Sequence, residues 1–137
     1  KPVVINTSRG EVIETSALLE AINSGIISDA VIDVWEHEPE INRELLEKVL
    51  IGTPHIAGYS ADGKANDTRM VLESFCRFFG KEMKFSIVPP EQPHVLYDSN
   101  ENVRQLQMYN PHLDCEVLRT HPETFEQLRS EYHLRRE

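Results

Sequence analysis

Cysteine is scarce in this sequence, and that scarcity excludes one class of small protein. Cys76 and Cys115 are the two cysteines of the 137 residues. They are too few for the disulfide framework that stabilises many small secreted domains. Cys76 lies within a helical pattern, which favours a small core residue over a redox centre. A reduced, cytoplasmic setting therefore fits the sequence best.

Long hydrophobic runs and an excess of basic residues are also missing. No apolar segment approaches the roughly 20 residues that a membrane helix needs, and no signal peptide is visible. The chain has 14 Lys and Arg against 23 Asp and Glu, and this net charge of −9 opposes binding to nucleic acid or to an anionic membrane. The histidines show no zinc-binding spacing, so we expect no metal site.

Three short runs of apolar, β-branched residues are separated by helical patterns. Such runs, when a turn follows them, are typical of buried parallel strands. We expect strands at residues 3–5, at residues 30–34 and just before Pro54. The helical patterns between them run from Ser16 to Ser24 and onward from Asn42, which can cap its helix. This alternation predicts an α/β fold with a parallel sheet.

Each predicted strand is followed by a side chain that can carry chemistry. Arg9 follows the first strand, Glu38 the second and His55 the third. Ligands bind outside the carboxyl ends of the strands in open α/β sheets, so we expect these side chains to converge on one cleft. A cation, a carboxylate and an imidazole suit the oxidation of an alcohol beside a carboxylate.

The three residue types predict separate roles in such an oxidation. His55 can act as the acid/base, because an imidazole titrates near neutrality. Glu38 can bind the far ring nitrogen and fix the tautomer. Arg9 can grip a carboxylate with two parallel hydrogen bonds. Taken singly, each has a plainer explanation: Arg9 can bind helix carbonyls, Glu38 can be an exposed turn residue and His55 can be a loop histidine.

The motifs at the strand ends are Asn6-Thr7-Ser8-Arg9-Gly10, Ile32-Asp33-Val34 followed by Glu38-Pro39, and Thr53-Pro54-His55-Ile56. Their residues, order and spacing resemble the D-2-hydroxy-acid dehydrogenase family. Residues 34–42 and 55–66, with Tyr59 after Gly58, are most similar to the subtype of that family that takes part in pyridoxal phosphate synthesis. The resemblance is strong from residue 2 to about residue 80.

This resemblance implies an NAD-dependent enzyme that oxidises a phosphorylated 2-hydroxy acid. It implies Arg9, Glu38 and His55 as catalytic residues. It also implies binding roles for further residues: Thr7, Ser8, Asp33 and Gly58 for the cofactor, and Arg9 and Tyr59 for the substrate. Simpler interpretations stay open, in which Asp33 is a capping residue, Gly58 a turn glycine and Tyr59 a packed aromatic.

A glycine-rich G-x-G-x-x-G pyrophosphate loop is absent from the sequence. Members of the family carry that loop upstream of the motifs above. We therefore expect this chain to be a C-terminal fragment that is inactive alone. Residues 1–80 would form the C-terminal half of a Rossmann-type sheet, 81–93 a linker and 94–137 part of a small α+β dimerisation domain. The subtype resemblance implies a homodimer.

The longest predicted helix runs from Ser60 to Phe79. Ser60 can cap it, and Gly80 can end it. Its apolar stripe is typical of a core face more than of a cofactor site, and the stripe comprises Met70, Val71, Ser74, Phe75, Phe78 and Phe79.

The tail beyond this helix has weaker patterns. Residues 88–93 are proline-rich and predict an extended linker, and residues 94–97 suggest a strand. Residues 98–107 are polar and ambiguous. A helix is expected from Thr120 to Tyr132, because Thr120 and Glu123 have the spacing of a capping box.

Other functions stay open. One is another member of the family, such as a phosphoglycerate or lactate-type dehydrogenase. A second is a non-catalytic binding or dimerisation module on the same scaffold, in which Arg9, Glu38 and His55 would lie far apart. A metal-binding regulator would need clustered histidines that the sequence does not show.

Overall fold

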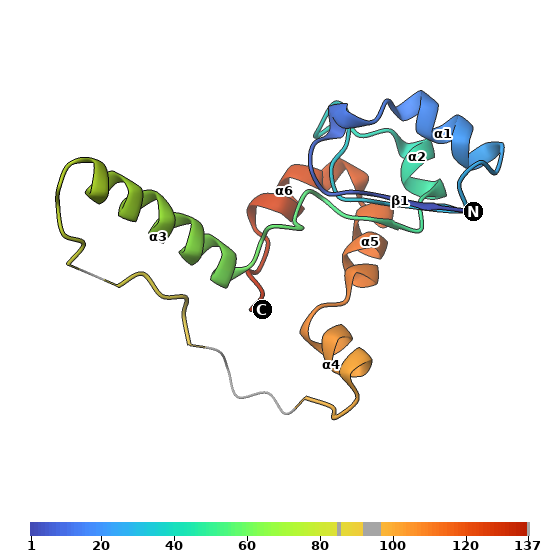
Figure 1. The fold of residues 1–137 in the computed structure, drawn as a ribbon. Helices are drawn as coiled ribbons and strands as arrows, with labels where there is room; N and C mark the ends of the chain where they lie inside the picture. Colours follow the sequence, from blue (N-terminus) through green and yellow to red (C-terminus); the bar gives the residue numbers. More distant parts are fainter. Residues whose placement is uncertain (85, 92–96, 137) are drawn as a thin grey trace. The chain divides into compact units, whose positions relative to one another are not determined.

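The computed structural model describes residues 1–84, 86–91 and 97–136 (Figure 1). The chain forms two compact units. The first comprises Lys1–Ala57 and Asn110–Tyr132, and the second comprises Gly58–Tyr109 and His133–Glu137. None of the helices in the described ranges is long and apolar enough to cross a membrane.

The first unit contains a parallel sheet of three strands in the order β1-β2-β3. The strands are β1 (Val3–Asn6), β2 (Asp29–Ile32) and β3 (Ile51–Gly52). In register, Asn6 pairs with Ile32, and Ile32 pairs with Gly52. The carboxyl ends of all three strands therefore lie level, and the segments that follow them share one edge of the sheet. The predicted α/β class is confirmed.

The helices of the first unit follow local sequence signals. They are η1 (Gly10–Val12), α1 (Thr15–Asn23), α2 (Arg43–Lys48), α5 (Pro111–Thr120), η2 (Pro122–Thr124) and α6 (Phe125–Ser130). Helix α1 ends at Asn23, two residues before Gly25, whose φ of 69° suits glycine. The Asn42 side chain caps α2 by accepting a hydrogen bond of 2.8 Å from the Leu45 amide. The end of α1 and the start of α2 both match the prediction.

Helices α5 and α6 complete the hydrophobic core of the first unit. Helix α5 packs against β3, and α1 packs against α2 (Figure 1). Leu118 and Phe125 are fully buried in one cluster with Leu46. The Arg119 guanidinium also binds the carbonyl oxygen of Val49 at the end of α2. Residues 110–132 are thus tied to the same core as the sheet.

The single helix predicted from Thr120 to Tyr132 is wrong. Thr120 is the last residue of α5, and its hydroxyl donates to the Glu116 carbonyl oxygen at 2.8 Å instead of capping a new helix. Helix α5 ends before Pro122, because proline disfavours helical backbone at the residue before it. Helix α5 was missed, although Asn110 caps it and Pro111 occupies its first turn.

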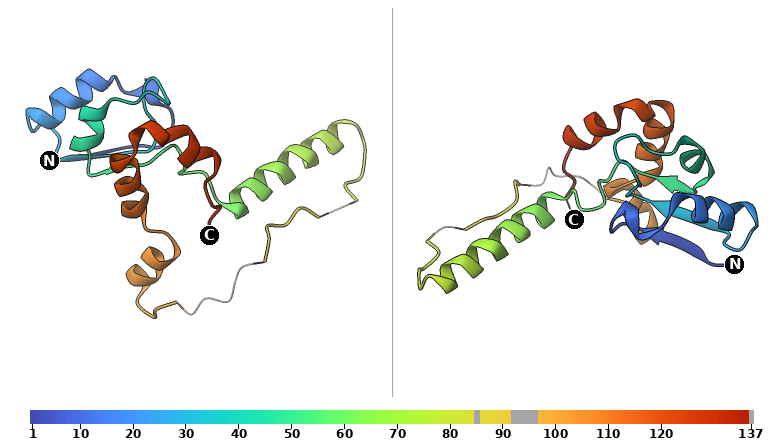
Figure 2. Two further views of the ribbon diagram at one scale, coloured as in Figure 1. Left: turned by 180° about the vertical axis from the view of Figure 1, so that it is seen from behind. Right: turned by 90° about the horizontal axis from the view of Figure 1, so that it is seen from above.

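The second unit contains α3 (Ala61–Phe78) and α4 (Glu101–Met108). Helix α3 is one continuous helix (Figure 2). As predicted, Ser60 caps it, with its hydroxyl accepting from the Gly63 amide at 2.9 Å. Helix α4 lies in the segment whose pattern was ambiguous. The strand suggested at residues 94–97 falls almost wholly outside the described residues.

The last residues of the chain pair with the start of α3 inside the second unit. The Ala61 amide donates to the Arg135 carbonyl oxygen at 2.9 Å. The Arg136 guanidinium makes two hydrogen bonds to the Asp62 carboxylate, at 2.7 and 2.9 Å. The Asp62 carboxylate thereby raises the pKa of Arg136. These contacts fix the first turn of α3.

The apolar stripe of α3 is exposed, so the prediction that it forms a core face is wrong for this chain. Phe78 is 83% exposed, and the rest of the stripe is exposed as well. Phe75 and Phe79 contact each other, with ring centroids 4.6 Å apart. Helical periodicity predicts that one face is apolar, but it does not say which element covers that face.

Candidate active site

The segment after β1 is shaped by a buried asparagine. The Asn6 side chain donates to the Arg9 carbonyl oxygen at 3.0 Å and accepts from the Ser8 amide at 3.2 Å. Such turns suit a short amide side chain at the end of a strand. They leave the Arg9 side chain exposed at the carboxyl edge of the sheet.

Gly10 allows this segment to pack directly on the chain after β2. A Cβ atom at Gly10 would lie 2.0 Å from the Trp35 carbonyl oxygen, so no larger residue fits. The structural reason for glycine at this position is the close approach of two backbones.

Glu38 links the second strand end to the third. One carboxylate oxygen accepts a hydrogen bond of 2.8 Å from the Trp35 amide. The other lies 2.8 Å from Nδ1 of His55. The Glu38 and His55 side chains are only 17% and 25% exposed, so solvent weakens this contact less than it would on an open surface. Because both oxygens of Glu38 have a partner, the orientation of the carboxylate is fixed.

His55 has an unusual backbone conformation. Its φ of 57° lies in the left-handed region, which few residues other than glycine adopt. The His55 amide donates to the Asp33 carbonyl oxygen at 2.8 Å, and this bond holds the residue in place. Strained backbone of this kind occurs often at functional sites.

Arg9, Glu38 and His55 line one pocket of about 210 Å³ in the first unit. The other residues that line it are Gly10, Glu11, Trp35 and His37. The three side chains come from the three strand ends, so the level register of the sheet brings them together. The wide separation that a non-catalytic module would show is not found.

Comparison with known proteins agrees with this arrangement. Residues 1–57 match the family model described as D-isomer specific 2-hydroxyacid dehydrogenase, NAD binding domain. This part of the chain is similar to that NAD-binding domain. Its match to the family model spans all three strands and the whole of the pocket lining.

Several curated relatives are named erythronate-4-phosphate dehydrogenase. The one from Bacteroides thetaiotaomicron is 70% identical over 138 residues, which cover all of this chain and 40% of the relative. The one from Porphyromonas gingivalis is 41% identical over 140 residues, covering 96% of this chain and 38% of the relative. An Escherichia coli relative is 49% identical over 85 residues, covering 62% of this chain and 22% of the relative. The chain thus spans at most 40% of the length of these dehydrogenases.

None of the residues predicted to bind the dehydrogenase cofactor is among the described residues that line the pocket. Thr7 and Ser8 are exposed at the strand edge beside Arg9. Asp33 is buried, and its carboxylate accepts hydrogen bonds from the Thr53 hydroxyl and the Ile56 amide. Gly58 and Tyr59 belong to the second unit, where the Lys64 ammonium lies 4.2 Å above the Tyr59 ring. Their binding roles stay predictions.

Three residues that support the pocket were missed or left undecided by sequence reasoning. Asn6 shapes the Arg9 segment, and Trp35 is both core and pocket wall, with 4% of its surface exposed. The Trp35 indole donates to the Thr53 carbonyl oxygen at 2.9 Å. Asn6 and Thr53 could have been found from their position, because each is a small polar residue directly at a strand end.

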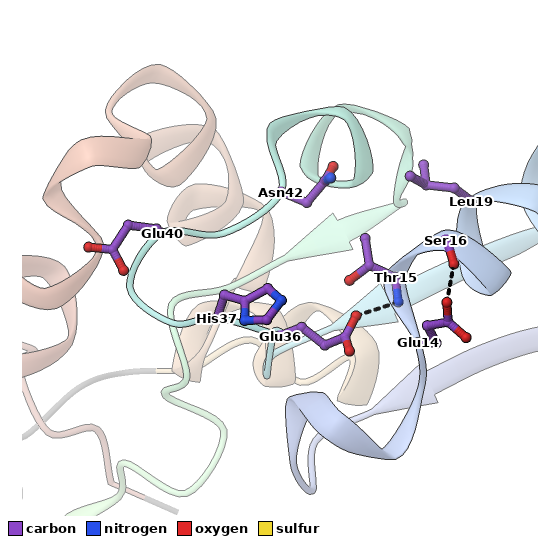
Figure 3. Close-up of a pocket in the computed structure, with 8 residues that line it drawn as sticks. All are labelled: Glu14, Thr15, Ser16, Leu19, Glu36, His37, Glu40 and Asn42. Atoms are coloured by element: carbon purple, nitrogen blue, oxygen red, sulfur yellow. Dashed lines mark hydrogen bonds between the residues drawn. The ribbon is translucent and has the colours of Figure 1, made fainter.

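A second pocket of about 470 Å³ lies beside the start of α1 (Figure 3). Figure 3 shows the Glu36 side chain reaching the Thr15 amide, which donates to it at 2.6 Å. Hydrogen bonds from the Thr15 side chain and backbone lower the pKa of Glu36, and the nearby His37 lowers it further. Glu14 and Glu40 also line this pocket. Within the described part of the chain, no three His, Cys, Asp or Glu side chains form a group that could hold a metal ion.

Proposed function

We propose that this chain is part of an enzyme that oxidises 4-phospho-D-erythronate to its 2-oxo acid with NAD, a step of pyridoxal phosphate synthesis. One observation carries the proposal: a cation, a carboxylate and an imidazole line one pocket at the carboxyl edge of a parallel sheet. The match to an NAD-binding domain and the names of the relatives support it.

His55 would take the proton from the C2 hydroxyl of the substrate. When Nδ1–H of His55 donates to Glu38, the lone pair of Nε2 is free to accept that proton. Glu38 in turn is oriented by the Trp35 amide. Its carboxylate stabilises the imidazolium that forms, as a buried acid does in other histidine-based sites.

Arg9 would bind the carboxylate of the substrate. Its guanidinium is exposed at the pocket, and one of its nitrogens donates to the Ser8 carbonyl oxygen at 2.6 Å. The planar fork of an arginine matches a carboxylate with two parallel hydrogen bonds, a geometry that lysine cannot reproduce. Held there, the C2 carbon would lie between Arg9 and His55.

When bound, NAD would supply the acceptor for the hydride that leaves C2. The residues here suit only its nicotinamide end, because the glycine-rich phosphate loop is not in this sequence. Thr7 and Ser8 are exposed at the strand edge. A Cβ atom at Gly58 would meet no described atom within 4 Å, which leaves room for close approach. Thr7, Ser8, Asp33 and Gly58 would hold the cofactor.

The remaining features of the proposal extend beyond the chain itself. The active form would be a cytoplasmic homodimer of the longer protein, with Tyr59 contributing to substrate binding. The 137 residues alone would not turn over substrate efficiently, because they lack the phosphate loop.

Steady-state assays of the complete protein that carries this chain test the proposal. We expect NADH formation with 4-phospho-D-erythronate and much slower reaction with 3-phosphoglycerate or D-lactate. His55→Ala should lower kcat by roughly 10²- to 10⁴-fold, the usual contribution of a general base. Equal turnover by His55→Ala and wild type would contradict the catalytic role. Preference for another 2-hydroxy acid would contradict only the substrate.

A further inference from the structure

The segment that carries His55 is held by a buried carboxylate. The Asp33 side chain accepts hydrogen bonds from the Ile56 amide at 2.8 Å and from the Ala57 amide at 3.0 Å. Asp33 itself is only 3% exposed. A buried carboxylate needs several donors to offset its loss of water. These two amides flank His55 on its C-terminal side, so the direction of the Asp33 carboxylate sets the path of the chain there.

The donor that orients this carboxylate is the hydroxyl of Thr53. Its Oγ1 donates to Oδ1 of Asp33 at 2.6 Å, the shortest of the hydrogen bonds described for that carboxylate. Thr53 is 6% exposed. Hydrogen bonds to ionised acceptors are short and strong, and this one lies out of reach of bulk water.

The backbone of Thr53 is fixed from two further sides. Its amide donates to the Ile32 carbonyl oxygen at 3.0 Å. Its carbonyl oxygen accepts from the Trp35 indole at 2.9 Å. The hydroxyl therefore projects from a backbone that two other parts of the unit hold, and it can act as a fixed reference point for Asp33.

We propose that Thr53 is a positioning residue for His55. Through its hydroxyl it orients the Asp33 carboxylate, which holds the amides of residues 56 and 57 and so keeps His55 at its left-handed φ with Nδ1 against Glu38. Thr53 does not line the pocket and touches no reacting atom. The proposal rests on the proposed dehydrogenase function, because it assigns Thr53 a task in that reaction.

Thr53→Ser and Thr53→Ala in the complete protein form a matched pair. Both lose the methyl group, and only the serine keeps a hydroxyl on Cβ. At temperatures where both variants remain folded, we expect the kcat of Thr53→Ser to stay within about threefold of wild type. The kcat of Thr53→Ala should fall roughly tenfold or more. Amide hydrogen exchange at Ile56 and Ala57 should be faster in the alanine variant only.

The outcomes separate this proposal from the one on which it rests. Equal kcat and equal amide exchange in the two variants, with His55→Ala inactive, would overturn the role of Thr53 and leave the dehydrogenase function intact. An active His55→Ala would instead overturn the function. If Thr53→Ala does not fold, Thr53→Val removes the hydroxyl while filling the space, and the same comparison with Thr53→Ser decides. A loss of thermal stability without a change in kcat also counts against the proposal.

Discussion

Nδ1 of His55 and Oε2 of Glu38 lie 2.8 Å apart although 17 residues separate them along the chain. Parallel strands whose carboxyl ends lie level bring the two segments to one edge. Because the Trp35 amide holds the other oxygen of Glu38, the carboxylate cannot rotate away from the ring without losing a hydrogen bond. The pair is therefore a fixed unit of the pocket.

Glu38→Gln in the complete protein should lower kcat by about 10²-fold or more, within the range for acid–base groups. Glutamine can still accept from the Trp35 amide with its oxygen, which turns its NH₂ toward His55. That NH₂ donates, so Nδ1 must accept and Nε2 must carry the proton, which is the wrong tautomer for a base. The ratio of kcat values for variant and wild type measures the effect.

Glu40→Gln is the matched control for that substitution. Glu40 is exposed and lies close to Glu38 in sequence, and it does not line the His55 pocket. Turnover by Glu40→Gln should equal that of wild type. Equal losses in the two variants would point to net charge, and not to the His55 contact, as the cause.

Arg9→Lys should weaken binding of the 2-hydroxy acid. One of two parallel hydrogen bonds to the carboxylate is lost, and hydrogen bonds to charged groups contribute about 1.5–3 kcal/mol each, or roughly 10- to 150-fold in kcat/KM. The KM for NAD should stay close to that of wild type. Arg43→Lys, on the exposed start of α2, should leave both constants unchanged. A kcat/KM for Arg9→Lys within twofold of wild type would rule out a bidentate grip.

Phe125→Ala should destabilise the first unit of this chain by about 3–5 kcal/mol, the usual cost of truncating a buried phenylalanine. Phe125 is fully buried beside Leu118, in the core that also contains buried residues of β2, α1 and α2. Phe78→Ala is the matched control, because Phe78 is 83% exposed and its truncation leaves no cavity. Urea unfolding of both variants measures the difference. Equal midpoints for the two would mean that residues 110–132 do not belong to this core.

The sequence was sufficient for the features that depend on local signals. The β-branched runs predicted β1 and β2, and the capping residues Asn42 and Ser60 predicted two helix starts. The common edge of a parallel sheet then placed the strand-end residues on one pocket. That step needs only a general rule of α/β topology and no knowledge of side-chain packing.

The sequence was insufficient where two local signals competed or where long-range packing decides. Thr120 and Glu123 have capping-box spacing, but Pro122 between them ends one helix and starts another. Periodicity showed the apolar face of α3 without showing that this face is exposed. The burial of Phe125 in the core of the first unit depends on contacts between segments far apart in sequence, which no local pattern encodes.

Glu36→Gln should reduce the stability of the folded chain in a pH-dependent manner. Glu36 accepts from the Thr15 amide at the start of α1, where the helix dipole also favours negative charge. Because hydrogen bonds from the Thr15 side chain and backbone hold the pKa of Glu36 below its usual 4.5, the charged side chain stabilises the folded state above that pH. The contribution falls as the pH drops through the lower, folded-state pKa, where Glu36 becomes protonated in the native protein as well.

Urea unfolding across an acid series measures this linkage. The difference in unfolding free energy between wild type and Glu36→Gln should be constant from about pH 7 to about pH 5 and shrink toward zero in more acidic solution. Glu40 is an exposed glutamate of the same pocket. Its variant Glu40→Gln should differ less from wild type in unfolding free energy at neutral pH. A difference for Glu36→Gln that grows on acidification would mean that the carboxylate is destabilised in the fold. In that case the hydrogen bond to Thr15 could not be what holds this segment against α1.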